Sequence, residues 1–489
     1  MNPTKLSVVL ASILAVALKA QADVRVPALF SDNMVLQQEM RAPIWGWADD
    51  GEQVTVTFRG KTAKAKAKDG KWMVKLNRLK AGGPDTLTVE GKNKIEIKNV
   101  LVGEVWVASG QSNMEWPLSR SFESTNDIKS SANPNLRLFL VAKAKADEPA
   151  KDVKAQWKDC GPESVPNFSA VAYYFGRDLQ KARNVPVGLI GTYWGGSPAE
   201  VWMSKQALES KPEYKADILD TYAEAARKAA ESGDKKKQPG WKPTELYNGM
   251  IAPLIPYGIK GAIWYQGESN AGKAEQYRRL FADMIRNWRH DWEQGDFTFI
   301  AVQLAPFDPR RSLEQIAEKP VQSGWAELRE AQLMATKTLP KVGMVVITDV
   351  GDLKDIHPTK KEPVGKRLAL AARGIAYGER IEYSGPIYES MFVQDAHAIL
   401  SFDHIDGGLE ARGGALKGFA ICGPDHTFVW AEAQIKGNKV LVSSPSVSEP
   451  VAVRYGWADF PVVNLWNKAD LPASPFRTDD FPMTTAKKK

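Results

Sequence analysis

The 489-residue sequence has only two cysteines and five histidines, and its one long apolar run lies near the N-terminus. Cys160 and Cys422 are too few for a disulfide scaffold, and the sequence leaves open whether they pair or are both buried thiols. No segment after residue 22 reaches the roughly 18 apolar residues of a membrane-spanning helix, which excludes a polytopic membrane protein. Hydrophobic residues (43%) and charged residues (25%) occur at ordinary globular levels, which excludes a disordered or collagen-like chain.

Several ligand-binding motifs are also missing. There is no H-E-x-x-H, no paired C-x-x-C, no P-loop and no G-x-G-x-x-G, so metal-dependent hydrolysis, nucleotide use and dinucleotide redox chemistry lose support. We therefore expect neither a metal ion nor an organic cofactor. The formal net charge is +7, but five lysines lie near the two termini (Lys5, Lys19, Lys487, Lys488 and Lys489). No internal basic patch with interleaved aromatics indicates nucleic-acid binding.

The N-terminal segment has the pattern of a secretory signal. Lys5 supplies a positive charge, the apolar run from Leu6 to Leu18 follows, and Ala20-Gln21-Ala22 is an A-x-A cleavage pattern. The sequence predicts a signal peptide over residues 1–22 and a secreted or periplasmic chain that starts near Asp23. An uncleaved N-terminal anchor is the alternative.

Three regions follow in the predicted mature chain. Residues 23–100 contain short strands separated by Asp-Gly and Gly-Pro turns, which favours an N-terminal β-sandwich. Residues 101–378 alternate apolar strands with amphipathic helices, which predicts an α/β fold with a doubly wound parallel sheet. Strands return in residues 379–489, and we expect this C-terminal β region to pack on the α/β domain. The strands expected in the middle region lie at 104–108, 186–190, 260–265, 297–303 and 342–348, and the clearest helices at 170–181, 275–288, 326–336 and 364–376.

Active sites of open α/β sheets form at the carboxyl ends of the strands, and four strand ends here carry polar residues or glycines. The first strand runs into Gly110-Gln111-Ser112, which could present a serine hydroxyl at the edge of the sheet. This segment lacks the second glycine of the G-x-S-x-G elbow, so a turn or N-cap serine is the plain alternative.

The second and third strand ends suit an oxyanion-binding site. Gly195-Gly196 could point backbone N–H groups at a developing negative charge without obstruction by a Cβ atom, although a plain tight turn explains the same pair. The run from Trp264 to Asn270 is more densely polar than a simple turn requires.

The fourth strand end carries His357, with Asp349, Asp352 and Asp355 eight, five and two residues before it. A histidine general base needs an acid that fixes its tautomer and stabilises the imidazolium. The other four histidines lie on a predicted helix or in the C-terminal region, where a structural role is expected.

In the segments at these four strand ends, the chain resembles the sialate O-acetylesterase family of SGNH-type serine esterases. The most specific matches are Gly110–Met114 and Trp264–Asn270, and the similarity covers nearly all of the predicted mature chain. It includes Leu29–Gln37, Gly103–Trp106, Ala452–Trp457 and Pro475–Asp479. The resemblance implies a flavodoxin-like sheet domain with β accessory parts and the removal of O-acetyl groups from sugars.

The resemblance also implies roles for individual residues. Ser112 would be the nucleophile and His357 the base, with Asp355 as the nearest acid. Asp352, Asp349 or a backbone carbonyl are the alternatives, because Lys354 stands where SGNH enzymes commonly place the acid. The N–H groups of Ser112 and of Gly195 or Gly196 would bind the oxyanion, with a side-chain donor from Gln266 or Asn270. The residues expected to bind substrate are Gln111, Asn113, Trp194 and Glu268.

The predicted function is therefore a secreted serine esterase that deacetylates sugars, most readily sialic acids, through an acetyl-serine intermediate. The partner would be a small-molecule or oligosaccharide O-acetylated sugar, with no nucleic acid and no membrane span after signal cleavage. Alternatives are an esterase for acetyl-xylan or other glycans, a lipase-like esterase, and a non-catalytic glycan-binding protein. The last predicts exposed aromatic platforms at Trp116, Trp194 and Trp264, because a flat ring face suits the C–H face of a sugar.

Overall fold

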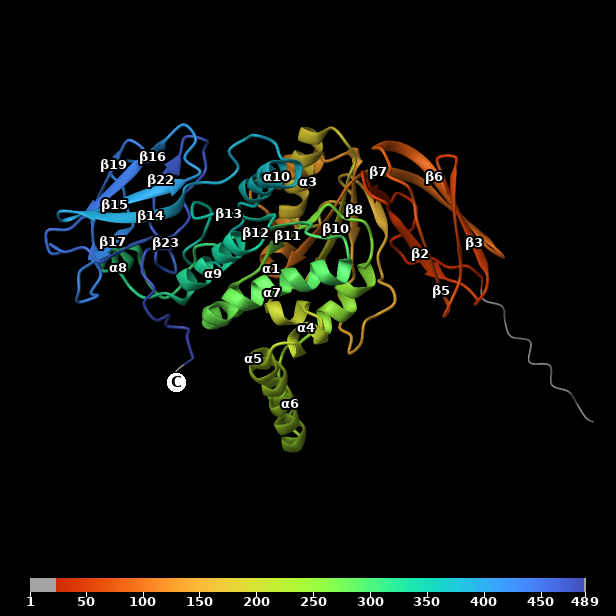
Figure 1. The fold of residues 1–489 in the computed structure, drawn as a ribbon, viewed down its shortest axis with the longest axis horizontal. Coiled ribbons are helices and arrows are strands. Elements are labelled where there is room, and N and C mark those ends of the chain that lie inside the picture. Colours follow the sequence, from red (N-terminus) through yellow and green to blue (C-terminus); the bar gives the residue numbers. More distant parts are fainter. Residues whose placement is uncertain (1–22, 488–489) are drawn as a thin grey trace, which may run out of the picture.

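The structure is a computed structural model that describes residues 23–487. The expected signal peptide, residues 1–22, lies outside the described residues. The described chain forms an elongated molecule with a central α/β region between two β regions (Figure 1). No helix in the described residues combines the length and the apolar character that a membrane crossing requires.

The N-terminal region consists of short strands that alternate buried and exposed residues. One sheet pairs β3 with β4 and β6, and β6 with β7, while β2 and β5 form a separate antiparallel ribbon. Val54 and Val56 of β3 share a hydrophobic core with Trp72 and Val74 of β5, as in two sheets that pack face to face. The strands are β1 (Val35–Gln37), β2 (Pro43–Trp47), β3 (Gln53–Phe58), β4 (Lys61–Lys66), β5 (Lys71–Lys75) and β6 (Gly82–Glu90).

Strand β7, Lys94–Gly110, belongs to two sheets at once. Its first half pairs with β6, and its second half pairs with β10 and β11 in the central sheet. The expected boundary at residue 100 therefore falls inside a continuous strand. The sequence did not indicate this, because the burial pattern changes along β7 from alternating to continuous without a turn.

The central sheet has the order β13-β12-β11-β7-β10-β8-β9. All neighbours from β13 to β8 are parallel, and only β9 is antiparallel. Because both faces of these strands are covered, β10, β11, β12 and β13 are buried along their whole length. The strands are β8 (Asn133–Leu140), β9 (Trp157–Cys160), β10 (Val187–Tyr193), β11 (Gly261–Tyr265), β12 (Thr298–Val302) and β13 (Val342–Val345).

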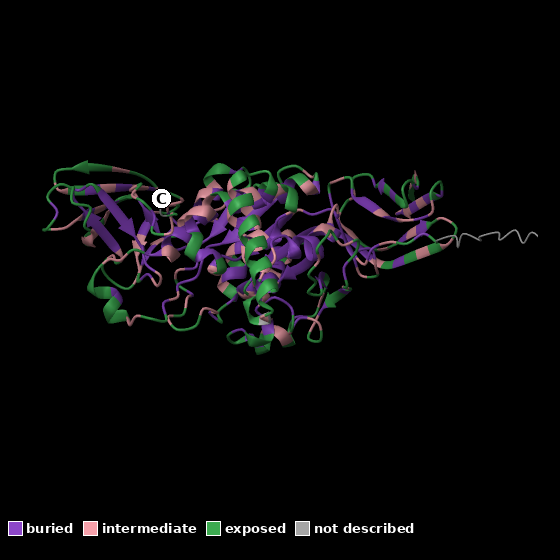
Figure 2. Cartoon of the chain, turned by 90° about the horizontal axis from the view of Figure 1, so that it is seen from below, coloured by how far each residue is buried: buried purple, intermediate pink, exposed green. Residues whose placement is uncertain are grey.

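A pair of helices covers each face of this sheet. Trp106 and Ile263 point into the core formed with α3 and α10, whereas Val107 and Trp264 point into the core formed with α7 and α9. Figure 2 shows the buried strands between helices whose outer sides are exposed. The prediction of an α/β fold is confirmed. The four covering helices are α3 (Ala170–Arg183), α7 (Ala274–Trp292), α9 (Gly324–Thr338) and α10 (Glu362–Tyr377).

Shorter helices connect these elements. Among them, α6 projects from the body of the molecule, at the bottom of Figure 1. They include α1 (Ser112–Glu115), α2 (Ser124–Lys129), α4 (Lys205–Glu209), α5 (Pro212–Tyr214), α6 (Thr221–Ser232) and α8 (Leu313–Glu318), and the 3₁₀ helices η1 (Leu118–Arg120) and η7 (Glu268–Lys273).

The C-terminal β region has its own hydrophobic core and is fixed to the central region by buried arginines. Arg329 of α9 donates to the carbonyls of Ala458 and Asp459. Arg477 of β23 pairs with Glu330 of α9 at 2.9 Å, so the C-terminal β region contacts the central region through this ion pair. Its strands are β14 (Ile387–Gln394), β15 (His397–Asp403), β16 (Leu409–Ala411), β17 (Phe419–Cys422), β18 (Val429–Trp430), β19 (Glu432–Lys436), β20 (Lys439–Ser443), β21 (Ala452–Tyr455), β22 (Leu465–Asn467) and β23 (Phe476–Arg477).

The two cysteines do not pair. Cys160 lies on β9 and Cys422 on β17, and both are free and buried. Burial raises the pKa of the Cys160 thiol to about 12. Of the two alternatives left open by the sequence, the buried thiols are therefore the correct one.

Candidate active site

Ser112 lies directly beyond the carboxyl end of β7, where a tight turn leads into α1. Gly110 adopts a φ of +136°, and a Cβ atom there would lie 2.2 Å from the carbonyl oxygen of Tyr265. Gln111 then donates its backbone N–H to the same carbonyl. Only glycine fits this crossing of β7 and β11, and the turn that it permits leaves Ser112 half-buried at the edge of the sheet.

His357 reaches Ser112 from the loop between β13 and α10. Its Nε2 lies 2.9 Å from Ser112 Oγ, although the two residues are 245 positions apart in the chain. Both side chains are half-buried, so the pair combines partial protection from water with access for a ligand. This is the serine–histidine contact of a nucleophile and its general base.

The three candidate acids before His357 have different positions. Asp355 Oδ1 accepts the backbone N–H of His357 at 2.8 Å and lies 3.5 Å from its Nδ1. Asp352 accepts the backbone N–H groups of Lys354 and Asp355 and so shapes the turn. Asp349 faces away and pairs with Arg367 at 2.6 Å. Asp355 is thus the acid beside the imidazole, although its side chain is 58% exposed and the contact is long.

Trp116 supports the imidazole from one side. Its ring stacks on His357 with centroids 5.4 Å apart and an interplanar angle of 19°. The indole Nε1 donates to the carbonyl of Arg120, whose guanidinium lies 4.1 Å from the centre of the same ring. Trp116 was expected only as a sugar platform, whereas its ring is largely buried and fixes the orientation of the base.

Four influences set the pKa of His357. Burial lowers it most; the carboxylate of Asp355 raises it, and the cations of Lys361 and Arg120 lower it further. The net effect is a pKa below the usual histidine value. The imidazole is therefore neutral at pH 7, as a general base requires.

The glycine pair lies on the other side of Ser112. A Cβ atom at Gly195 would lie 3.2 Å from the Cβ of Ser112, so glycine allows the close approach of the two segments. The N–H of Gly195 donates to Glu115 Oε2 at 2.6 Å. Gly196, with a φ of +75°, keeps an N–H that has no partner in the described part of the chain. The two glycines, which the sequence left as equal candidates for the oxyanion donor, therefore differ: the N–H of Gly195 is occupied and that of Gly196 is free.

Gln266 and Asn270 belong to a buried hydrogen-bond network below this turn. The Nε2 of Gln266 donates to the carbonyl of Ser197 and to Asn270 Oδ1. Asn270 accepts the N–H of Ala199 and donates to Glu200. Both side chains are buried and brace the segment that follows the glycine pair. The network occupies both N–H groups of the Gln266 amide but only one of the two at Asn270 Nδ2, so an oxyanion donor from Asn270 stays a prediction.

Gln111 also connects strand ends. Its Oε1 lies within 3.5 Å of the N–H groups of Gly267 and Ser269, which follow β11. Its Nε2 has no hydrogen-bond partner among residues 23–487, although the residue directly precedes Ser112. Gln111 therefore retains a free side-chain donor next to the nucleophile. The sequence had predicted Gln111 only as a substrate-binding residue.

Asn113 forms the centre of a buried polar cluster that also contains Glu268 and Lys361. Its Nδ2 donates to Glu268 Oε1 at 2.7 Å and to the carbonyl of Ile356 at 3.0 Å, while its Oδ1 accepts the Lys361 Nζ at 2.5 Å. Asn113 is 0% exposed, so its expected contact with substrate is corrected to a supporting role. The same cluster engages Glu268, and it fixes the residue before His357.

Lys361 is the functional neighbour that the sequence analysis missed. It is 1% exposed, and its ammonium lies near the faces of Trp116 and Tyr265. Burial lowers the pKa of Lys361 to about 7 and raises the pKa of Glu268. Its only sequence signal is a position four residues after His357, which does not distinguish a buried lysine from an exposed one.

The aromatic residues at the site differ in exposure. Trp264 is fully buried under the sheet and Trp116 is 9% exposed, so neither offers an open face. Trp194 is half-buried, meets Trp241 edge-on, and lies near the ammonium groups of Lys143 and Lys145. Of the three expected sugar platforms, only Trp194 remains beside the site.

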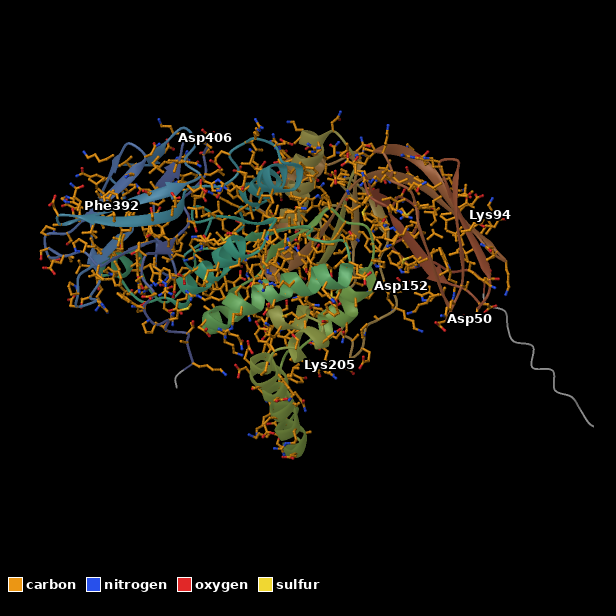
Figure 3. All side chains as sticks on the ribbon, in the orientation of Figure 1. Asp50, Lys94, Asp152, Lys205, Phe392 and Asp406 are labelled. Atoms are coloured by element: carbon orange, nitrogen blue, oxygen red, sulfur yellow. The ribbon has the colours of Figure 1, made fainter. Side chains whose placement is uncertain are left out.

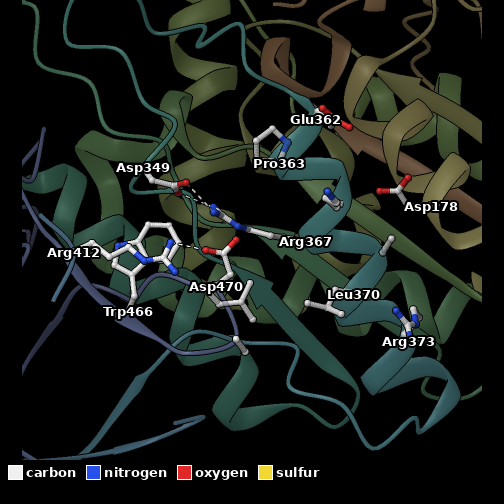
Figure 4. A pocket seen from close by; sticks show the side chains of 14 residues that line it. Asp178, Asp349, Glu362, Pro363, Arg367, Leu370, Arg373, Arg412, Trp466 and Asp470 are labelled. Atoms are coloured by element: carbon white, nitrogen blue, oxygen red, sulfur yellow. Dashed lines mark hydrogen bonds and ion pairs between the residues drawn. The ribbon is translucent and has the colours of Figure 1, made fainter. Parts of the chain in front are cut away.

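A separate cavity of about 600 Å³ lies between α10 and the C-terminal β region. Figure 4 shows Arg367 paired with Asp349 there, and Arg412 paired with Asp470 beside the ring of Trp466. This cavity contains neither Ser112 nor His357. In the described residues, no group of three His, Cys, Asp or Glu side chains has the arrangement of a metal site.

Comparisons with known proteins agree on the kind of chemistry. Residues 102–373 match the family model described as carbohydrate esterase, sialic acid-specific acetylesterase. The sialate O-acetylesterase of Homo sapiens is 30% identical over 518 residues, which cover 96% of this chain and 95% of that protein. That of Mus musculus is 29% identical, with 96% and 97% covered. A carbohydrate acetylesterase from Xanthomonas citri is 40% identical, with a TM-score of 0.84 over 94% of this chain and 100% of that one.

Proposed function

The chain belongs to the family of sialic acid-specific acetylesterases, which are carbohydrate esterases, and on this premise we propose that it removes O-acetyl groups from sialic acids by a serine mechanism. It is a carboxylic ester hydrolase that deacetylates sugars. The observation that carries the proposed mechanism is the 2.9 Å contact between Ser112 Oγ and His357 Nε2.

In the first step, His357 takes the hydroxyl proton of Ser112 while Oγ attacks the acetyl carbonyl carbon. The resulting oxyanion would be bound by the N–H of Ser112, the free N–H of Gly196 and the free Nε2 of Gln111. When the tetrahedral intermediate collapses, the imidazolium of His357 gives its proton to the departing sugar oxygen. The products of this step are the deacetylated sugar and acetyl-Ser112.

In the second step, His357 takes a proton from water, and the water oxygen attacks the acetyl carbonyl. Collapse of this intermediate returns the proton to Ser112 Oγ and releases acetate. Asp355 stabilises the imidazolium in both steps, and its exposure and the 3.5 Å contact indicate a modest contribution.

The strand order supports the SGNH type of fold with flavodoxin-like topology. When β8 and the antiparallel edge strand β9 are set aside, the order β10-β7-β11-β12-β13 becomes 2-1-3-4-5 along the chain, which is the flavodoxin-like order. We also propose the division into an N-terminal β region, a catalytic region over residues 101–378 and a C-terminal β region, with β7 shared by the first two. The positive, apolar and A-x-A segments of residues 1–22 support secretion.

The test is acetate release from a panel of O-acetylated sialic acids and acetyl-xylan, with the unchanged protein and with Ser112→Ala. We expect the unchanged protein to release acetate from sialic acids with the higher kcat/KM, and Ser112→Ala to release almost none. Faster turnover of acetyl-xylan would overturn the proposed substrate but leave the serine mechanism in place. Full activity of Ser112→Ala would reject the mechanism.

A further inference from the structure

The β2–β5 ribbon of the N-terminal region has two unlike faces. In its antiparallel register, Trp45 lies opposite Met73 and Trp47 lies opposite Lys71, so these four side chains share one face. The opposite face carries Ile44, Trp72 and Val74, which are buried in the core of the N-terminal region. On the first face, Trp45 packs in part against the core, edge-on to Phe30 and Tyr257, whereas Trp47 lies outside that core.

The other face is unusually aromatic for a face that is not buried. Trp45 and Trp47 are half-buried, and Met73 is 44% exposed. Outward faces of antiparallel strands are normally polar. The indole Nε1 atoms of Trp45 and Trp47 have no hydrogen-bond partner in the described residues. The Trp47 ring is thus partly accessible outside the core, and both tryptophans hold a free N–H donor on the ribbon.

This face forms one wall of a hollow of about 510 Å³. The segments Pro149–Lys151 and Ala252–Pro256 form the opposite wall. Asp152, which follows the first of these segments, lies between the N-terminal strands and the central region in Figure 3 and accepts the N–H of Ala28, which fixes the wall. A second hollow of about 400 Å³ shares Met73 and Pro256 with the first, so the two hollows adjoin and are together called the groove.

The charges along this groove have mostly one sign. The cationic residues that line the two hollows are Lys66, Lys71, Lys151, Arg41 and Lys75, and none of them forms an ion pair with another described residue. The first hollow contains no carboxylate in its lining, and the second contains only Glu293. An anionic ligand would therefore meet several cations that are free to pair with it.

We propose that this groove, which we call the Trp45–Trp47 groove, is a second binding site that takes a chain of acidic sugars. The flat faces of the indoles suit the C–H faces of pyranose rings, and the free Nε1–H groups can donate to sugar hydroxyls. The surrounding lysines would pair with the sugar carboxylates. The groove shares no lining residue with the Ser112 site, so it would hold a polymer while another part of that polymer is deacetylated.

The test measures binding separately from hydrolysis. The ligand is colominic acid, a homopolymer of sialic acid, and the protein is the full chain with Ser112→Ala, titrated by calorimetry at 50 and 200 mM salt. We expect saturable binding that weakens as salt rises, and no binding of neutral dextran. Adding Trp47→Ala should weaken the affinity by roughly three- to tenfold, and adding Lys71→Gln should reduce the dependence on salt.

Matched variants in the C-terminal β region serve as controls. Trp430 is 38% exposed and Lys436 is exposed, so Trp430→Ala and Lys436→Gln should leave the affinity unchanged. Trp47→Ala with Ser112 intact should hydrolyse p-nitrophenyl acetate at the normal rate, which shows that it folds. The proposal is overturned if colominic acid does not bind, if both groove variants bind as tightly as the unchanged groove, or if duplex DNA binds equally well. Each of these results leaves the proposed esterase function intact, because that function is measured by acetate release.

Discussion

Two buried clusters of charged residues in this molecule differ in how their charges are paired. At the junction with the C-terminal β region, Asp479 pairs with Arg454 through both carboxylate oxygens and also with Arg477, which pairs in turn with Glu330. At the candidate active site, Lys361 and Glu268 are bridged only by the neutral side chain of Asn113.

This difference in pairing matches two different roles. The Asp479 cluster holds two regions of the chain together, whereas the Lys361–Asn113–Glu268 cluster sets the electrostatics of the candidate active site. Within the Asp479 cluster, each of these charges directly contacts an opposite charge, as a purely structural cluster requires. At the active site the pairing is incomplete, so burial is not fully compensated and the pKa of Lys361 falls to about 7. Groups with shifted pKa values tend to gather where chemistry occurs, and the lowered pKa of Lys361 and the raised pKa of Glu268 fit that rule.

The largest expected effect is on activity alone. Ser112→Ala should lower kcat for p-nitrophenyl acetate by about 10⁴- to 10⁶-fold, because the nucleophile is lost. Its melting temperature should match that of the unchanged protein, since Ser112 Oγ contacts only His357 among the hydrogen bonds of the described residues. Kinetics and thermal melting measure the two quantities, and a large loss of stability would contradict the separation.

The junction cluster should show the reverse pattern. Asp479→Ala leaves Arg454 and one side of Arg477 without their carboxylate, and breaking a buried pair in this way costs about 3–5 kcal/mol of unfolding free energy. The measurement is urea unfolding, with kcat determined on the fraction that is folded. A normal kcat with lowered stability is expected, whereas a lowered kcat at full stability would break the comparison.

Lys361→Met should affect the reaction through the position of His357. Asn113 would lose the ammonium that fixes its Oδ1, and the Ile356 carbonyl that it holds would shift, so we expect kcat to fall by about 10²-fold with little change in KM. Lys360→Met is the matched control, because Lys360 is exposed and adjacent. An equal fall of kcat in both variants would show that Lys361 has no specific role in the reaction.

The same variant changes the pH dependence. The neutral form of His357 is the active base and its pKa is lowered, so kcat/KM should fall as the pH drops through an inflection below about 6.5. Besides burial, the charged groups that act on His357 are Asp355, Lys361 and Arg120. Because the cation of Lys361 lowers this pKa, Lys361→Met should move the inflection to higher pH. An unchanged pH profile of kcat/KM would show that Lys361 acts only through packing.

The smallest expected effect belongs to Asp355. Its side chain is 58% exposed and its contact with Nδ1 is 3.5 Å, so Asp355→Asn should lower kcat by only about two- to fivefold, as for an exposed ion pair. Steady-state kinetics near pH 7.5 test this. A loss near 10⁴-fold, typical of a buried triad acid, would show that Asp355 closes onto the imidazole during the reaction.

Strand periodicity and the positions of Ser112 and His357 could be predicted, because the carboxyl ends of parallel strands meet at one edge of a sheet. The roles of Gln266 and Asn270 could not. The polar density after β11 indicated function correctly, but the sequence does not show whether an amide points at a ligand or at a neighbouring loop. Lys361 escaped prediction for a related reason, since a lysine is normally exposed and its burial depends on Asn113 and Trp116, which are distant in sequence.

Because β7 is one continuous strand shared by two sheets, it limits where the chain can be truncated. A chain that began at residue 101 would keep Ser112 but lose the half of the strand that pairs with β6, together with β1, which pairs with Leu101 and Val102. The N-terminal sheet would lose an edge in the same cut. We therefore expect residues 23–378 to melt in a single cooperative transition, so that a stable minimal esterase must retain the N-terminal strands.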